Sequence, residues 1–351
     1  MHYIDKSDPI VWMGRFLYAH YFVGNGAHGI GQSGGISLTM RPCDVKMDKM
    51  ANEYMFFDME CADGTHVCSV GYVICDAAFV VCEKRDVLID PQCKFKLSRA
   101  GFDPWIRLAY PEKAFYDSPT FAARYTELQA LFTAPDRVFL GHSILSDLHF
   151  LAAACARYRK PQLLPDVYDT QKFYAAYTEQ KQMRSLEAIV QDLGIDASHL
   201  CEHKSCDDAE MSMLVAKELC ARYECTLPAL LQKHRSTVVR GKDAVLAQAV
   251  RHLKKQYPHP SNRRVPAVCL GDTDDYDVDA RIRLAQALYR KGYAYAESVA
   301  KCRFFVSFGY SGAREEAFAK AVAAGKRIRK ITPDELSRML GVTVDSRGGI
   351  E

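Results

Sequence analysis

The chain is predicted to have an α/β fold, and three observations lead to this prediction. First, residues 52 to about 220 alternate between short apolar runs typical of strands and longer segments with the helical spacing of apolar residues. Second, a shorter alternation of the same kind begins near residue 265. Third, the 351 residues are 48% hydrophobic and 25% charged, which is ordinary for a globular protein of two or three domains.

Three strands open the first alternation. Apolar runs at 54–61, 66–75 and 77–89 follow one another with short interruptions, which predicts an antiparallel meander. Ser118-Pro119 then predicts the start of a helix with proline at its first position. Apolar residues follow on one face of that helix, at Phe121, Tyr125, Leu128 and Phe132.

A fourth strand and another helix come next. Residues 137–140 form a short strand-like run that ends at Gly141. Ser143 is expected to cap the following helix, because its hydroxyl can accept from a free N–H of the first turn. Asp147 would then lie one turn inside this helix, near its start.

Two more helices complete this part of the chain. Ser185 is expected to cap the first, and Gly194 is expected to end it in the usual left-handed position. A loop carrying His203 leads into the second helix, which begins near Asp208.

Acidic residues interrupt the apolar strand at 54–61. Asp58 and Glu60 are two positions apart, so both side chains point to the same face of the strand. A buried, unpaired pair of carboxylates is unfavourable, and a divalent cation would offset its charge. Hard cations such as Mg²⁺ take oxygen ligands of this kind.

Each of these features has an ordinary explanation when it is taken alone. Asp58 and Glu60 could be a chance pair at a strand end, Asp147 a solvated helix residue, and His203 with Asp208 a surface pair. Their combination, on elements that could meet, indicates a catalytic site instead. A loop histidine near metal-held carboxylates is suited to act as a general base, because it changes charge near neutral pH.

In these motifs the chain resembles the DEDDh family of 3′–5′ exonucleases. The first family motif, a strand ending in Asp-x-Glu, is similar to Phe57-Asp58-Met59-Glu60. The second, His-Asn-x-x-Phe-Asp-x-x-Phe-Leu, is similar to the run from His142 to Leu151, and the third, His-x-x-x-x-Asp, is similar to His203 through Asp208. Asp169-Thr170 also resembles a recurrent family dipeptide. The resemblance covers about residues 52–220 and implies a ribonuclease H-like fold, with a mixed five-stranded sheet flanked by helices.

Three positions depart from the family pattern. Cys61 stands where the family often has Thr or Ser, Ser143 replaces the usual Asn, and Ser146 replaces the usual Phe. These departures leave the details of substrate binding open. The resemblance implies five candidate positions for substrate contact: Met59, Cys61, His142, Ser143 and Ser146.

The resemblance also implies a mechanism with two Mg²⁺ or Mn²⁺ ions. Asp58 would bridge the two ions, Glu60 and Asp208 would complete the first, and Asp147 would hold the second. His203 would be the general base. The activity implied is removal of nucleoside 5′-monophosphates from single-stranded 3′ ends.

Two rival functions stay open at this point. DNA is favoured as the substrate, in replication or repair, and the alternative enzyme is an exoribonuclease of the RNase T or oligoribonuclease kind. A rival of another class is a non-catalytic adaptor built on the exonuclease fold. The five catalytic positions are all intact, which argues against the adaptor.

Composition sets further limits on the function. The net charge of +3 does not by itself indicate nucleic acid, but basic residues cluster between 221 and 265, where they could follow phosphates or form a solvated helical connector. The 13 cysteines without a secretory signal predict a reducing, cytoplasmic setting. A zinc site is not expected at Cys201, His203 and Cys206, because zinc needs a second pair of ligands at suitable spacing. A membrane span is not expected either, because no run reaches the roughly 18 apolar residues that one requires.

The chain is divided by these patterns into five parts. An N-terminal extension at 1–50 precedes the exonuclease-like domain at 51–222. Its residues 24–35 are rich in Gly and Ser, which favours a flexible extension, and a start codon assigned too far upstream is the alternative. A basic connector at 223–264 ends in a linker, Pro258-His259-Pro260-Ser261-Asn262. Residues 265–342 have the element order strand-helix-strand-strand-helix-strand-helix, which resembles a BRCT domain that could bind a replication or repair protein. A generic small α/β domain is the alternative, and residues 343–351 form a tail.

The segment at 91–119 is long and rich in aromatic residues. These aromatic residues could form a wall on which bases stack: Phe95, Phe102, Trp105, Tyr110, Phe115 and Tyr116. An ordinary hydrophobic flap over the domain is the favoured alternative.

Overall fold

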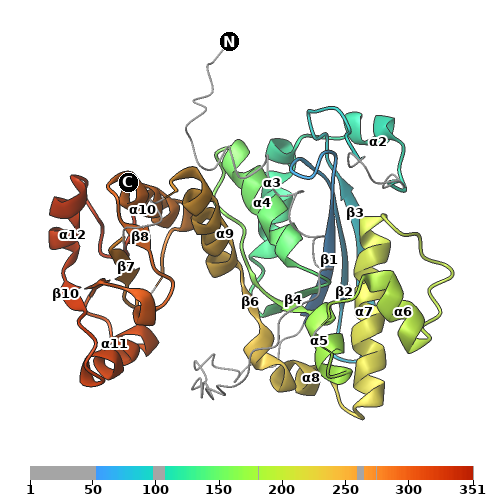
Figure 1. The fold of residues 1–351 in the computed structure, drawn as a ribbon. Helices are drawn as coiled ribbons and strands as arrows, with labels where there is room; N and C mark the ends of the chain where they lie inside the picture. Colours follow the sequence, from blue (N-terminus) through green and yellow to red (C-terminus); the bar gives the residue numbers. More distant parts are fainter. Residues whose placement is uncertain (1–52, 98–106, 181, 259–264, 274, 351) are drawn as a thin grey trace. The chain divides into compact units, whose positions relative to one another are not determined.

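Figure 1 shows the computed structural model of the chain, which describes residues 53–97, 107–180, 182–258, 265–273 and 275–350. The extension at 1–50 and residues 259–262 of the predicted linker lie outside the described residues. The chain divides into two compact units between Gly241 and Lys242, and each unit has its own sheet.

The sheet of the N-terminal unit has six strands in the order β3-β2-β1-β4-β5-β6. Their bounds are Glu53–Cys61 (β1), Val67–Cys75 (β2), Val81–Leu88 (β3), Arg137–Gly141 (β4), Asp166–Asp169 (β5) and Val239–Arg240 (β6). The predicted meander is confirmed, because β2 pairs antiparallel with both β1 and β3. β4 and β5 run parallel to β1, and β6 runs antiparallel to β5, so the predicted mixed sheet is confirmed. The predicted strand number of five was wrong, since the two residues of β6 are too few to show a period in the sequence.

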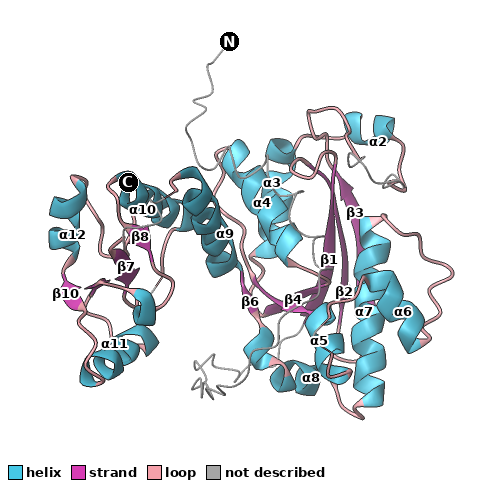
Figure 2. Ribbon diagram, viewed as in Figure 1, coloured by secondary structure: helices cyan, strands magenta, loops and turns pink. Residues whose placement is uncertain are grey.

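Helices cover both faces of this sheet. They are α2 (Glu112–Tyr116), α3 (Phe121–Phe132), α4 (Leu145–Arg157), α5 (Thr170–Tyr177), α6 (Leu186–Leu193), α7 (Ser205–Arg222) and α8 (Leu227–Lys233), with a 3₁₀ turn at Arg235–Thr237. Figure 2 shows α3 and α4 on one side of the sheet and α7 on the other. Every residue of β2 is buried, as expected for a strand covered on both faces.

Alternation along β1 assigns its side chains to two apolar layers. Phe56 belongs to the core formed with α6, α7 and α8, where Val215 and Leu219 are also fully buried. Phe57 points the other way, and its ring meets Phe132 of α3 edge-to-face with centroids 5.1 Å apart. Asp58 shares the α7 face with Phe56, because side chains two positions apart lie on one side of a strand. This packing directs the acidic end of β1 toward α7.

A glycine in β2 allows the start of α7 to lie directly on the sheet. A Cβ atom on Gly71 would be 2.0 Å from the backbone N of Cys206 and 2.0 Å from the carbonyl carbon of Ser205. Atoms cannot approach so closely, so only glycine permits this contact. The contact fixes the height of α7 above β2 and β1.

The helix boundaries confirm some predicted caps and correct others. Ser185 accepts a hydrogen bond from Ala188 N, and Gly194 ends α6 with φ 69°, both as predicted. The helix start at Ser118-Pro119 was wrong, because α3 begins at Phe121 and Thr120 caps it. Ser143 does not cap α4 either: it has φ 54°, and Ile144 takes the cap position without a side-chain hydrogen bond.

The aromatic residues described within 91–119 pack on one another. Phe95 and Phe115 have ring centroids 5.4 Å apart, and Tyr110 meets Phe115 edge-to-face. They form a small core with Ala62 of the β1–β2 turn and Cys68 of β2. This packing favours the hydrophobic flap over a wall of free aromatic faces. Phe102 and Trp105 lie outside the described residues.

The C-terminal unit has a four-stranded parallel sheet in the order β10-β9-β7-β8. Its elements are β7 (Ala267–Leu270), α10 (Val278–Arg290), β8 (Ala294–Tyr295), a 3₁₀ turn at Val299–Lys301, β9 (Phe304–Val306), α11 (Ala313–Ala323), β10 (Arg329–Ile331) and α12 (Pro333–Leu340). The predicted order of strands and helices is therefore confirmed. The predicted tail is not separate, since Ile350 N donates to Ala280 O of α10 at 3.2 Å.

Helix α9 (Gly241–Gln256) packs with the C-terminal unit, although the sequence placed it in a connector at 223–264. The Tyr276 hydroxyl donates to Asp243 at 2.6 Å, and Lys242 pairs with Asp275. Within the same stretch, α8 and β6 belong to the N-terminal unit. The boundary between the units therefore differs from the predicted one. The contacts that decide it join residues about 30 positions apart, and local composition carries no sign of them. Among the described residues, no helix is long and apolar enough to cross a membrane.

The contact at Gly71 yields a stability prediction. Gly71→Ala should lower the free energy of unfolding by at least about 3 kcal/mol, because backbone atoms block the added methyl group. Gly194→Ala is the matched control: its Cβ would meet nothing within 4 Å, and the left-handed backbone alone should cost about 1 kcal/mol. Chemical denaturation measures both values. Equal losses would show that α7 does not need the contact.

Candidate active site

The acidic end of β1 is the first part of the site. Asp58 and Glu60 alternate with the buried side chains of Met59 and Cys61, as the sequence predicts. The strand pairs with β2 on one side through this whole stretch, which keeps the backbone extended. Asp58 is close enough to Asp147, Asp208 and Glu60 for the charge of each to act on it.

Asp147 joins this strand from the first turn of α4. Its Oδ1 accepts a hydrogen bond from Met59 N at 2.8 Å, although the two residues are 88 positions apart. Asp147 is 4% exposed. The bond orients the carboxylate and fixes it beside the backbone between Asp58 and Glu60.

The loop before α7 supplies the remaining two residues. His203 N donates to Asp208 Oδ2 at 3.1 Å, and His203 Nδ1 lies 3.3 Å from Glu60 Oε1. The backbone of His203 is left-handed, with φ 59°, a conformation that non-glycine residues seldom adopt. This turn directs the imidazole back toward β1. The structure thus brings together all five residues that the sequence singled out.

Burial, reinforced by charge crowding, dominates the electrostatics of this cluster. Burial, followed by the charges of Asp147 and Asp208, holds the pKa of Asp58 well above its usual range. Burial and the charge of Glu60 raise the pKa of Asp208 to about 8. The hydrogen bond to Glu60 raises the pKa of His203. The cluster therefore favours any cation that enters it.

The donor set fits a hard divalent cation. Asp58, Glu60, Asp147 and Asp208 offer carboxylate oxygens, and one oxygen each from Glu60 and Asp208 lies within 4.8 Å of a ring nitrogen of His203. Asp208 Oδ1 is buried, and no donor among the described residues reaches it. A buried carboxylate oxygen without a partner is costly, and a bound cation would satisfy it.

Asp86 of β3 is part of this arrangement, and the sequence analysis missed it. Its Oδ1 accepts from Cys206 N at 2.7 Å and from the Ser205 hydroxyl at 3.2 Å, at the first turn of α7. Its Oδ2 accepts from the Tyr110 hydroxyl at 2.7 Å. Asp86 therefore ties β3, the aromatic segment and the start of α7 together. Its position within an alternating strand gave no signal of these distant partners.

Asp169 organises the other side of the site. It caps α5 by accepting from Gln171 N at 3.0 Å, and the same Oδ1 accepts from Ser143 N at 3.0 Å. The second bond holds Ser143 in its left-handed conformation. Burial raises the pKa of Asp169. The dipeptide Asp169-Thr170 noted in the sequence thus has a structural role beside the cluster.

The five candidate substrate positions fall into two groups. Met59, Cys61 and His142 have buried side chains, and His142 is hydrogen-bonded to Thr170 at 3.1 Å. Ser143 and Ser146 are partly exposed. Only the two serines therefore present side chains that a bound molecule could reach directly.

Both cysteines beside His203 make long hydrogen bonds to the residues that follow them. Cys201 Sγ donates to Glu202 O, and Cys206 Sγ donates to Asp207 Oδ1. Asp207 is also paired with Lys84.

One family model matches part of the chain. Residues 115–219 match the DEDDh_C family model, described as DNA polymerase III subunit epsilon-like, C-terminal domain. No curated protein matches the chain by sequence. The matched residues of the N-terminal unit, from α2 to α7, are therefore similar to the DEDDh exonuclease family.

Several solved structures are similar to about half of the chain. A full-length 3′-exonuclease is 15% identical over 51% of this chain and 63% of its own, with a TM-score of 0.42. The nuclease domain of 3′hExo, a DEDDh family member, bound to rAMP, is 14% identical over 51% and 96%, with a TM-score of 0.42. Exonuclease I of E. coli in complex with a dA16 oligonucleotide is 15% identical over 53% and 43%, with a TM-score of 0.40. The chain thus spans less than two thirds of the first and third of these proteins.

The contacts of Asp86 predict a positioning role. Asp86→Ala should destabilise the protein by about 2–4 kcal/mol, because Cys206 N and the Tyr110 hydroxyl would lose their acceptor. Asp86→Asn should recover most of this loss, since its amide can accept from Cys206 N and donate to Tyr110. Thermal denaturation of the two variants makes the comparison. If the Asn variant were as unstable as the Ala variant, the charge of Asp86, rather than its hydrogen bonds, would hold the start of α7.

Proposed function

We propose that the N-terminal unit is a metal-dependent 3′–5′ exonuclease that releases nucleoside 5′-monophosphates from single-stranded 3′ ends. The observation that carries the proposal is the meeting of four carboxylates and a histidine from β1, α4 and the start of α7. Within the described part of the chain, Asp208 Oδ1 is buried and has no hydrogen-bond partner. Such crowding of like charges is unfavourable by itself, and it is typical of sites that bind cations and phosphate esters.

Each carboxylate has a distinct role in this proposal. Asp58 would bridge two Mg²⁺ or Mn²⁺ ions, Glu60 and Asp208 would complete the first, and Asp147 would hold the second. When bound, the ions would supply positive charge that stabilises the attacking and leaving oxygens of the phosphodiester. Asp147 is kept in place by Met59 N, and Asp208 by His203 N, so two of the ligands are oriented in advance.

His203 would accept the proton of the attacking water. Its side chain is 38% exposed, so solvent and substrate can reach it. Its Nδ1 is now shared with Glu60 at 3.3 Å, a long hydrogen bond. Once Glu60 serves as a cation ligand, this bond would weaken and the imidazole would be available as a base.

The substrate is proposed to be DNA, and the C-terminal unit supports this choice. Its order β7-α10-β8-β9-α11-β10-α12 is the one that suggested a BRCT-like module for a replication or repair partner. Asp272 Oδ2 accepts from Arg314 N and Glu315 N at 2.9 and 3.0 Å, at the start of α11. A carboxylate at this helix end repels a phosphate, so the partner would be recognised without a phosphorylated residue.

Digestion of matched oligonucleotides tests the proposed function. DNA labelled at its 5′ end should shorten stepwise from the 3′ end with Mg²⁺ or Mn²⁺, and excess EDTA should stop the reaction. Asp208→Asn should abolish it, whereas Asp196→Asn, an exposed control, should leave it intact. Full digestion in excess chelator would disprove the metal mechanism. Faster digestion of RNA would support the exoribonuclease alternative, and no digestion of either by a folded protein would support the adaptor.

His203→Asn tests the proposed base. Asparagine tolerates the left-handed backbone at this position but cannot accept a proton at neutral pH, so the fold should survive while the chemical step slows by about 10²–10⁴-fold. Mn²⁺ affinity, measured by calorimetry, should stay unchanged. His199→Asn, an exposed histidine in the same region, is the control. If Mn²⁺ binding were lost together with activity, His203 would be a ligand instead.

A further inference from the structure

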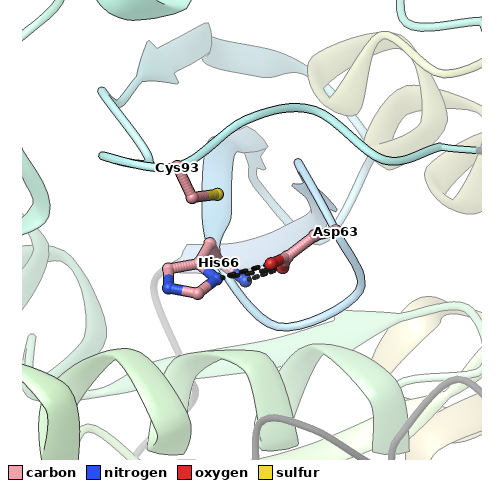
Figure 3. A group of neighbouring side chains, drawn as sticks. All are labelled: Asp63, His66 and Cys93. Atoms are coloured by element: carbon pink, nitrogen blue, oxygen red, sulfur yellow. Dashed lines mark hydrogen bonds and ion pairs between the residues drawn. The ribbon is translucent and has the colours of Figure 1, made fainter.

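A second group of metal-ligating side chains lies in the N-terminal unit, outside the carboxylate cluster. Asp63 and His66 belong to the turn between β1 and β2, and Cys93 belongs to the segment after β3. One ligand atom from each residue lies within 4.8 Å of the others. Figure 3 shows the three side chains directed toward one another across the gap between the two segments.

The turn orients Asp63 before any ion binds. Oδ1 of Asp63 accepts from Thr65 N and His66 N, both at 3.0 Å, and from the Thr65 hydroxyl at 2.9 Å. These bonds hold the carboxylate so that both of its oxygens lie near His66 Nδ1, Oδ1 at 3.0 Å and Oδ2 at 2.9 Å. Hydrogen bonds to the second oxygen of a ligating carboxylate are the usual outer support of a metal site.

The segment that carries Cys93 is fastened to the same turn. Lys96 N donates to Ala62 O at 2.7 Å, and the Tyr116 hydroxyl donates to Cys93 O at 3.2 Å. The backbone of both segments is therefore held in place, with one ligand atom of each residue within 4.8 Å of the others. All three residues are partly exposed, so an ion can enter from solvent.

We propose that Asp63, His66 and Cys93 form a binding site for one divalent ion of the zinc class. Carboxylate oxygen, imidazole nitrogen and thiolate sulfur are the three ligand types that zinc takes in proteins. Two ligands at the usual zinc distance of about 2.0 Å are ~3.3 Å apart in a tetrahedron, close to the present separation of Oδ2 and Nδ1. The fourth position would hold water. A sulfur ligand disfavours Mg²⁺, so this site and the carboxylate cluster would select different ions.

Binding of the ion would release one proton and move another. The Cys93 thiol would lose its proton to solvent and become a thiolate. A neutral His66 would keep one proton but move it from Nδ1 to Nε2, because Nδ1 would hold the ion. Arg157 is nearby, donating to Thr65 O at 3.2 Å, and its positive charge opposes the ion. The two negative ligands, Asp63 and the thiolate, offset both Arg157 and part of the ion's charge.

The bound ion would clip the β1–β2 turn to the segment after β3. The turn begins just beyond Glu60, so the clip would stabilise the end of the strand that carries the acidic pair. The site does not depend on nuclease activity, and binding can be measured without a substrate.

Spectroscopy of bound Co²⁺ and Cd²⁺ tests the site in the full-length protein. Asp208→Asn serves as the background, so that ions in the carboxylate cluster are weakened. One equivalent of Cd²⁺ or Co²⁺ should bind after dialysis and show the absorption of a metal–thiolate bond, and Zn²⁺ should displace it. This absorption should disappear when Cys93→Ser is added, and it should persist when Cys82→Ser, an exposed cysteine of β3, is added instead.

Two results would overturn the proposal. One is the absence of metal–thiolate absorption in the Asp208→Asn protein while its fold, judged by circular dichroism, is intact. The other is absorption that survives Cys93→Ser, which would assign the ion to a different cysteine. If Zn²⁺ raised the melting temperature of the wild type but not of Cys93→Ser, this would support the link between the two segments independently of the absorption measurement.

Discussion

The seating of α7 on β2 is the contact on which the candidate active site depends. Gly71 lets the backbone of Ser205 and Cys206 touch the sheet, and Asp86 holds the same two residues by hydrogen bonds. Asp208 lies two residues after this pair, and His203 lies two residues before it. A shift of this helix by the width of a methyl group would therefore move two of the five clustered side chains away from β1.

The carboxylates of the candidate active site lie next to an apolar core. Phe56 and the buried residues of α7 form one continuous core, and Asp58 continues the same face of β1. The apolar core makes the position of the carboxylates rigid, but it also removes the water that would screen them. Because water is removed, burial is the largest cause of the raised pKa values of Asp58, Asp147 and Asp208.

The boundary between the two units differs from the one that composition predicted. The segment between them contains β6, which completes the first sheet, and α9, which is tied to the second unit through Asp243 and Lys242. Basic residues in this stretch are thus distributed over two folded units. Their proximity in sequence is not evidence of a common surface.

Local patterns in the sequence determined much of the site, because strand and helix periods are set by the backbone alone. The two-residue period placed Asp58 and Glu60 on one face, and the helical spacing of the apolar residues that follow placed Asp208 near a helix start. Only the tertiary structure decided the features that join segments distant in the chain. These are the support from Asp86, the left-handed backbone at Ser143 that Asp169 holds, the two-residue strand β6, and the group formed by Asp63, His66 and Cys93. Each depends on a hydrogen bond or an approach between elements, for which no local period exists.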